Sequence, residues 1–276
     1  SAFHATNAFF VNNKAHKDGG AVAVGGQSSV YLTNCSVASN TANRGGGIGS
    51  YTGSSYVEIR NSIVEDNVAA GYTGGGILSY NALSIYASII RRNKGIQDNG
   101  EGGGIVSYGG NVRIEGSEIS DNSNYRGGGI YSTHSRLVVF RSKIYRNTAK
   151  GLGGGIAMRN QKKGSAGPTR FVESKYSYFG LLLSQCFLVN NTAGNGGGIA
   201  AFSHAVSIGI VNTLFEGNDR NPNGNDAVAT MFVKFPFPHR AYKNTALGRD
   251  MYFPPRESIF YASSHPLTVQ LVNVTY

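Results

Sequence analysis

The chain has 276 residues, of which 40% are hydrophobic, and its formal net charge is +10. This length and apolar content allow a sizeable core, and no run of 18 apolar residues is present, so direct membrane insertion is not expected. The positive charge suggests an anionic partner, but no nucleic-acid recognition motif accompanies it, so nucleic acid is not expected.

A short pattern returns along the chain and sets its organisation. It consists of a small residue, an apolar residue two positions later and an asparagine three positions after that. The asparagines are Asn13, Asn40, Asn67, Asn93, Asn122, Asn147, Asn191 and Asn218. Subtracting consecutive residue numbers gives spacings of 27, 27, 26, 29, 25, 44 and 27, and a weaker ninth copy ends at Asn244. A glycine-rich step into an apolar residue follows each asparagine. Such a period is typical of a solenoid.

The stretch before each small residue alternates apolar and polar side chains, which predicts a strand. Examples in chain order are Val30–Cys35, Tyr56–Ser62 and Asn111–Ser117. A leucine-rich repeat would need several leucines in each copy, which are lacking. We therefore predict an all-β parallel β-helix of about nine to ten coils, a single domain over residues 1–276 about 50 Å long. Both ends of the sequence fall inside a coil, so we expect a segment of a longer solenoid.

Stacked coils turn every repeated position into a row of side chains. We expect the asparagines to bond amide to amide and to adopt the left-handed backbone of a corner, which asparagine tolerates. The glycines are expected where close backbone approach or a positive φ excludes a Cβ. Cys35 and Cys186 occupy the inward small-residue row five coils apart, about 24 Å, so they should be free, buried thiols.

One row of alternating charge invites a catalytic interpretation. The position before the asparagine reads Asp66, Arg92, Asp121 and Arg146 in successive coils. Opposite charges on neighbouring strands form a surface ladder. The alternative is a pectinase-like polysaccharide lyase or hydrolase, in which Asp66, Arg92 and Asp121 would be catalytic. Signatures of polygalacturonases are absent, so we do not expect an enzyme.

Other rows carry weaker signals. Tyr51, Tyr80 and Tyr108 share one position, where stacked rings stabilise a solenoid edge or bind sugar faces, and we favour the structural role. The six histidines lack the spacing of a zinc site, so neither a metal nor a cofactor is expected. Glycosylation sequons occur at Asn34, Asn190 and Asn273, and the alternation directs all three outward.

Two segments depart from the repeat and are candidate contact regions. An inserted loop at residues 159–180 lengthens one spacing to 44, and residues 231–265 are rich in aromatic residues and proline. Insertions in solenoids go to loops, often on the binding face. The expected partners are other protein chains or copies of the chain itself, and glycans. The candidate contact residues are Lys162, Lys163, Arg170, Tyr176, Tyr178, Phe235 and Phe237.

The assembled rows resemble the polymorphic outer membrane protein (Pmp) repeat of chlamydiae. Phe10–Asn13 and Phe215–Asn218 match its FxxN motif, and Gly19–Val22 matches its GGAV form. The resemblance implies a right-handed parallel β-helix at the cell surface that acts as an adhesin or autotransporter passenger. Similar glycine-rich repeats occur in surface proteins of protists and algae. We therefore expect a non-enzymatic extracellular or cell-surface rod, adhesive or built into an appendage or matrix fibre.

Overall fold

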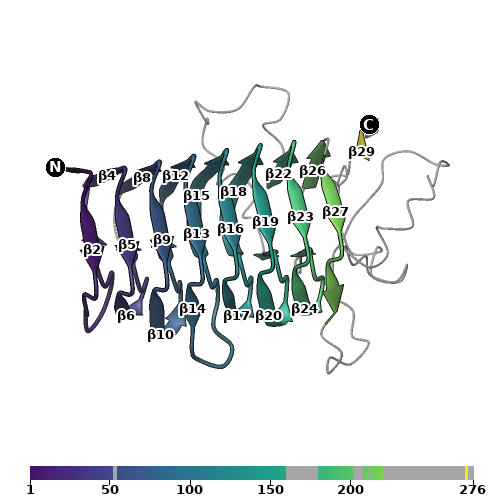
Figure 1. The fold of residues 1–276 in the computed structure, drawn as a ribbon, viewed down its shortest axis with the longest axis horizontal. Helices are drawn as coiled ribbons and strands as arrows, with labels where there is room; N and C mark the ends of the chain where they lie inside the picture. The colour runs from purple at the N-terminus through teal and green to yellow at the C-terminus, as the bar shows by residue number, and fades with distance from the viewer. Residues whose placement is uncertain (52–54, 160–179, 202–207, 212, 221–270, 273–276) are drawn as a thin grey trace.

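The computed structural model describes residues 1–51, 55–159, 180–201, 208–211, 213–220 and 271–272. Within them the chain winds through three sheets whose strands stack along one axis, and all of the strand pairs are parallel (Figure 1). No helix occurs in these segments, and so none that could cross a membrane. The predicted all-β parallel solenoid is therefore confirmed.

The largest sheet, here called sheet A, has 14 strands in two rows. One row contains β1 (Ala2–Thr6), β4 (Ser29–Thr33), β8 (Tyr56–Arg60), β12 (Ala82–Tyr86), β22 (Leu181–Ser184), β26 (Ile208–Val211) and β29 (Leu271–Val272). The other contains β3 (Val22–Val24), β7 (Ile48–Ser50), β11 (Ile77–Ser79), β21 (Ile156–Arg159) and β25 (Ile199–Ala201). The long strands β15 (Ile105–Glu115) and β18 (Ile130–Phe140) belong to both rows.

Two smaller sheets complete each coil. Sheet B contains β2 (Phe9–Val11), β5 (Ser36–Ala38), β9 (Ile63–Glu65), β13 (Ile89–Arg91), β16 (Glu118–Ser120), β19 (Lys143–Tyr145), β23 (Phe187–Val189) and β27 (Leu214–Glu216). Sheet C contains β6 (Thr41–Arg44), β10 (Val68–Thr73), β14 (Lys94–Gly95), β17 (Ser123–Arg126), β20 (Thr148–Leu152), β24 (Thr192–Asn195) and β28 (Asp219–Arg220). The eight strands of sheet B correspond to the asparagines from Asn13 to Asn218, which makes about seven turns. The ninth copy, at Asn244, lies outside the described residues.

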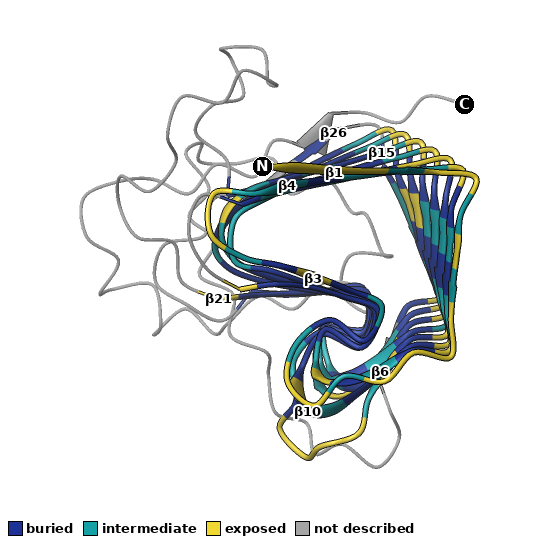
Figure 2. Cartoon of the chain, turned by 90° about the vertical axis from the view of Figure 1, so that its left-hand side faces the viewer, coloured by how far each residue is buried: buried dark blue, intermediate teal, exposed yellow. Residues whose placement is uncertain are grey.

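The core lies between the two rows of sheet A and sheet B. In the end-on view, the row with β1 and β4 faces the row with β3, and β6 and β10 of sheet C lie beyond β3 (Figure 2). The isoleucine after each glycine-rich step enters this core at 0–1% exposure, in a row formed by Ile48, Ile77, Ile105, Ile130, Ile156 and Ile199. Burial of each such side chain contributes about 1.5–3 kcal/mol, so the row is a large part of the stability.

The asparagines form a continuous buried ladder. The amide oxygen of each one accepts hydrogen bonds from the backbone and side-chain N–H groups of the asparagine one coil earlier. At Asn122 the acceptor distances from Asn93 are 3.0 Å for both donors. The Asn122 amide nitrogen in turn donates to Asn147 at 3.0 Å and to the Ile90 carbonyl at 2.9 Å. The same geometry recurs from Asn13 to Asn218.

The prediction that these asparagines adopt the left-handed backbone is wrong. The left-handed residue is the one before each asparagine, with φ between 53° and 58° at Asn12, Ser39, Asp66, Arg92, Asp121, Arg146 and Asn190. That residue turns the chain at the corner, and the asparagine after it points its side chain into the interior. The corner therefore tolerates several residue types, whereas the inward position requires the amide.

The glycine run is required by close approach of neighbouring coils. A Cβ on Gly103 would lie 2.3 Å from the Gly128 carbonyl oxygen and 2.5 Å from the Ser123 nitrogen. A Cβ on the next residue, Gly104, would lie 3.0 Å from the Asn122 side chain. The glycines therefore leave room for the next coil's backbone and for the asparagine ladder. The repeated asparagine and the repeated glycine run therefore depend on each other.

The 44-residue spacing is an insertion that leaves the stack intact. Asn147 still donates to the Asn191 amide oxygen at 3.0 Å. Strand β18 pairs through its first half with β21 and through its second half with β22, so the extra residues enter between these two strands. Apart from its end residues, the predicted loop at 159–180 lies outside the described residues, as do residues 231–265.

Both cysteines are buried and free, as the spacing predicts. Each backbone N–H donates to a hydroxyl one coil further on, Cys35 to Ser62 at 2.9 Å and Cys186 to Thr213 at 3.3 Å. The Cys35 thiol donates to the Thr33 carbonyl, two residues earlier in the chain, as the Ser62 hydroxyl does to the Arg60 carbonyl. The cysteines thus replace serine in one row.

Because serine already fills this row in other coils, we expect Cys35→Ser to change the free energy of unfolding by less than about 1 kcal/mol. Burial raises the pKa of the Cys186 thiol to about 11, so its reactive thiolate is scarce near neutral pH. Urea unfolding should measure the first effect, and a thiol-specific dye the second. Both thiols should react only after unfolding. Rapid labelling of the folded protein would contradict their placement.

Candidate functional site

The three candidate catalytic residues lie in one row at the corner before the asparagine ladder. Asp66 accepts two hydrogen bonds from the Arg92 guanidinium, at 2.9 and 2.8 Å. Asp121 accepts two from Arg146 instead, both at 2.8 Å. The row of alternating charge therefore divides into two bidentate pairs. Neighbouring positions pair in the same way, Arg91 with Glu65 at 2.7 Å and Lys143 with Glu118 at 3.8 Å.

These contacts determine what the carboxylates can do. The hydrogen bonds from Arg146 lower the pKa of Asp121, which keeps this carboxylate ionised and paired. A general acid must instead hold a proton near neutral pH. The pairs are largely exposed, and such ion pairs contribute about 0–1 kcal/mol each. The row neutralises charge along the rod and favours one stacking register.

The tyrosine row forms part of a second, smaller core on the opposite side of the β7 to β21 row from the main core. The rings of Tyr80 and Tyr108 have centroids 5.0 Å apart, and Tyr131 meets Tyr108 edge-on at 6.3 Å. Tyr80 and Tyr108 pack on Leu78 and on the residues at the equivalent position in neighbouring coils. Tyr51, the third member predicted, is 37% exposed. The rings of Tyr80 and Tyr108 are engaged with each other, which agrees with a structural role.

A charged residue that sequence reasoning missed completes this cluster. The Tyr108 hydroxyl donates a hydrogen bond to Glu101, which also lies 3.5 Å from Arg126. Burial and this hydrogen bond raise the pKa of Tyr108, so its hydroxyl stays protonated and remains a donor. Glu101 lies just before a glycine run. Aligning that position would have revealed a second charge row, in which Asp18 pairs with Arg44 at 2.6 Å.

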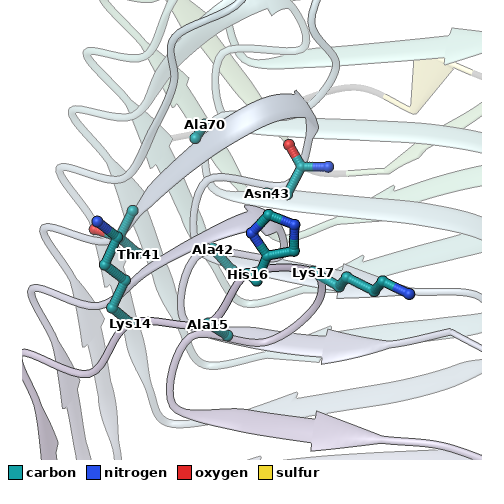
Figure 3. A pocket seen from close by; sticks show the side chains of 8 residues that line it. All are labelled: Lys14, Ala15, His16, Lys17, Thr41, Ala42, Asn43 and Ala70. Carbon is teal, nitrogen blue, oxygen red and sulfur yellow. The ribbon is translucent and has the colours of Figure 1, made fainter.

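A shallow groove lies on sheet C at the N-terminal end of the rod. It has a volume of about 750 Å³ and spans the first three coils. Lys14 and Thr41 lie on one side and His16, Asn43 and Lys17 on the other, with alanines between them (Figure 3). Sequence reasoning did not identify these residues as a site, because only the stacking of coils brings them together.

The remaining predicted positions are distributed over the surface or lie outside the described segments. Asn34 and Asn190 are exposed and left-handed at two different corners, with φ of 54° each. Asn273 and all of the predicted contact residues fall outside the described segments. In the part of the chain that is described, no group of three or more acidic, histidine or cysteine residues is arranged to hold a metal ion.

The three parallel sheets, with their buried amide ladder and paired corner charges, define a parallel β-helix solenoid. The chain belongs to the right-handed β-helix family, whose model matches residues 2–219. No curated protein and no solved structure matches it significantly. Membership of this family establishes the fold and its right-handed winding. It does not identify the biochemical role.

Proposed function

We propose that the chain is a non-enzymatic structural β-helix of an extracellular or cell-surface protein. The observation that carries this proposal is the use of its repeated polar residues. The asparagine amides form the hydrogen bonds of the buried ladder. Asp66, Arg92 and Asp121 form ion pairs with residues of neighbouring coils. Residues repeated in almost every coil therefore hold coil to coil. This suits a rigid rod that spans distance and presents side chains at a fixed pitch.

Two features support a place outside the cell. The sequon residues Asn34 and Asn190 are exposed, which an attached glycan requires. The FxxN and GGAV motifs are similar to those of Pmp adhesins, for which a surface location and an adhesive role are the implied functions. We infer either an adhesive passenger or a unit of an appendage or matrix fibre, with contacts through the inserted loop, residues 231–265, or the rod surface.

We expect no turnover when the protein is incubated with polygalacturonate or alginate and calcium. Asp66 and Asp121 each accept two hydrogen bonds from an arginine one coil away, so both carboxylates are already engaged in contacts within the rod. The assay measures unsaturated products and new reducing ends, with Arg92→Ala beside the wild type. Activity that is present in the wild type and lost in Arg92→Ala would replace the structural proposal with the enzymatic one.

The surface location is measured separately, with antibodies against the folded rod on intact and permeabilised cells of the source organism. Labelling of intact cells supports the proposal. Labelling only after permeabilisation would overturn it, whatever the turnover assay shows.

A further inference from the structure

We propose that the groove on sheet C binds an acidic polysaccharide, one that carries carboxylate or sulfate groups. The groove presents the Lys14, His16 and Lys17 side chains from one coil, and no acidic residue lines it. Lys14 and Lys17 lie three positions apart in the sequence, where the chain bends. In Figure 3 the Lys14 and Lys17 side chains lie on opposite sides of the groove. The proposal rests on the proposed function, because an extracellular location would bring the rod into contact with such a polysaccharide.

The part of the chain that the structure describes does not neutralise the charge of this groove. Most other cations in the described coils pair with a carboxylate one coil away or on the same strand. Lys14 and Lys17 make no ion pair among the described residues, and Asp18 beside them is bound to Arg44 at 2.6 Å. Strand register places Lys94 three coils further along the row of Lys14 and Thr41, about 14 Å away. The positive face therefore extends along the rod, as a linear polyanion would need.

An exposed aromatic ring lies on the same face. Tyr72 is 64% exposed and points outward from β10, two positions after Ala70, which lines the groove. The pairing of β10 with β6 is irregular between Ala69 and Thr73, and such bulges re-aim side chains. An aromatic face next to cations suits a sugar, because the ring packs on the apolar face of the pyranose. The amide of Asn43 and the hydroxyl of Thr41 are available for sugar hydroxyl groups.

A polysaccharide fits these features better than a nucleic acid. The groove is open and shallow, and it offers one exposed ring rather than a series of stacking platforms. A hydroxyl group lies on the side of Lys14 and an amide group on the side of Lys17, which suits a chain rich in hydroxyl groups with an anionic group at intervals. Binding of an oligonucleotide is therefore an outcome that the test must separate.

The test measures binding of fluorescent oligogalacturonate, dextran sulfate, neutral dextran and a single-stranded oligonucleotide by fluorescence anisotropy. We expect binding of at least one acidic glycan, weakening with added salt, and none of neutral dextran. Lys14→Ala with Lys17→Ala should weaken binding by about tenfold or more. Tyr72→Ala should weaken it by about two- to tenfold. The carboxylate and sulfate ligands together identify which anionic group is recognised.

The matched control is Arg60→Ala with Lys143→Ala, which removes the same charge from sheets A and B, away from sheet C. Equal loss in both double variants would mean attraction by net charge alone and would overturn the proposal. Equal affinity for the oligonucleotide, or no acidic-glycan binding, would do the same. Lys14→Gln with Lys17→Gln repeats the test if the alanine variant unfolds. Glycan binding and substrate turnover are measured separately. A result that rules out the groove as a glycan-binding site can therefore be distinguished from a result that rules out a non-enzymatic function.

Discussion

Replacing Asn122 by alanine is expected to lower the free energy of unfolding by about 3 kcal/mol. The change removes the acceptor of the Asn93 backbone and side-chain N–H groups, at 3.0 Å each. It also removes the donor to the Ile90 carbonyl and one of the donors to Asn147. Several buried groups lose a partner at once, and each costs about 1–3 kcal/mol when left unsatisfied. Urea unfolding followed by circular dichroism measures the change.

The first rung of the ladder provides a matched control. Asn13 donates to Asn40 at 2.9 Å but is itself exposed, and water reaches the groups that its removal leaves without a partner. Asn13→Ala should therefore cost less than about 1 kcal/mol. Asn122→Asp keeps one acceptor oxygen but buries a charge, so it should destabilise more than alanine near neutral pH and less as the carboxyl protonates. Equal, small losses for Asn13→Ala and Asn122→Ala would show that the ladder does not stabilise the fold.

The sequence predicts this architecture because, in a solenoid, residues that are one repeat apart in the chain lie side by side in neighbouring coils. Once Asn122 and Asn147 are recognised as equivalent, their stacking follows from the 4.8 Å spacing of strands, as do the pairing of Asp66 with Arg92 and the separation of the two cysteines. The same logic predicts the inward isoleucine row, because alternation fixes which face each side chain occupies.

The parts that the period does not describe were missed or misplaced. The left-handed corner was assigned to the asparagine rather than to the residue before it, because propensity alone cannot separate two adjacent polar positions. Glu101 lies directly before a glycine run and Tyr131 directly after Ile130. An alignment on the asparagines alone does not bring these positions into register, because the polar turn varies in length, whereas an alignment on the glycine runs does. The groove at Lys14 and Lys17 arises from a curl of the chain, and the asparagine and isoleucine periods carry no information about that curl.

Gly103→Ala tests the second repeated signal, and we expect it to cost more than about 3 kcal/mol or to prevent folding. The added Cβ would lie 2.3 Å from the Gly128 carbonyl oxygen and 2.5 Å from the Ser123 nitrogen. Both are backbone atoms of the adjacent coil, and both are hydrogen-bonded to the coil that carries Gly103: the Gly128 carbonyl accepts from Gly104, and the Ser123 N–H donates to the Asn93 carbonyl. Neither atom can rotate away as a flexible side chain would, so the coils must separate or tilt. Because pairing with both neighbouring coils holds each strand, the strain extends beyond one turn.

Gly116→Ala separates this steric effect from glycine's conformational freedom. Gly116 has φ of +57°, and a Cβ there meets nothing within 4 Å. Alanine at this corner pays only for the left-handed backbone, about 1–2 kcal/mol. Gly103 is not left-handed, so its loss comes from contact between coils. We therefore expect the urea midpoint to fall much further for Gly103→Ala than for Gly116→Ala. The reverse order would mean that the glycine run serves backbone conformation, and close stacking of the coils would no longer explain why it repeats.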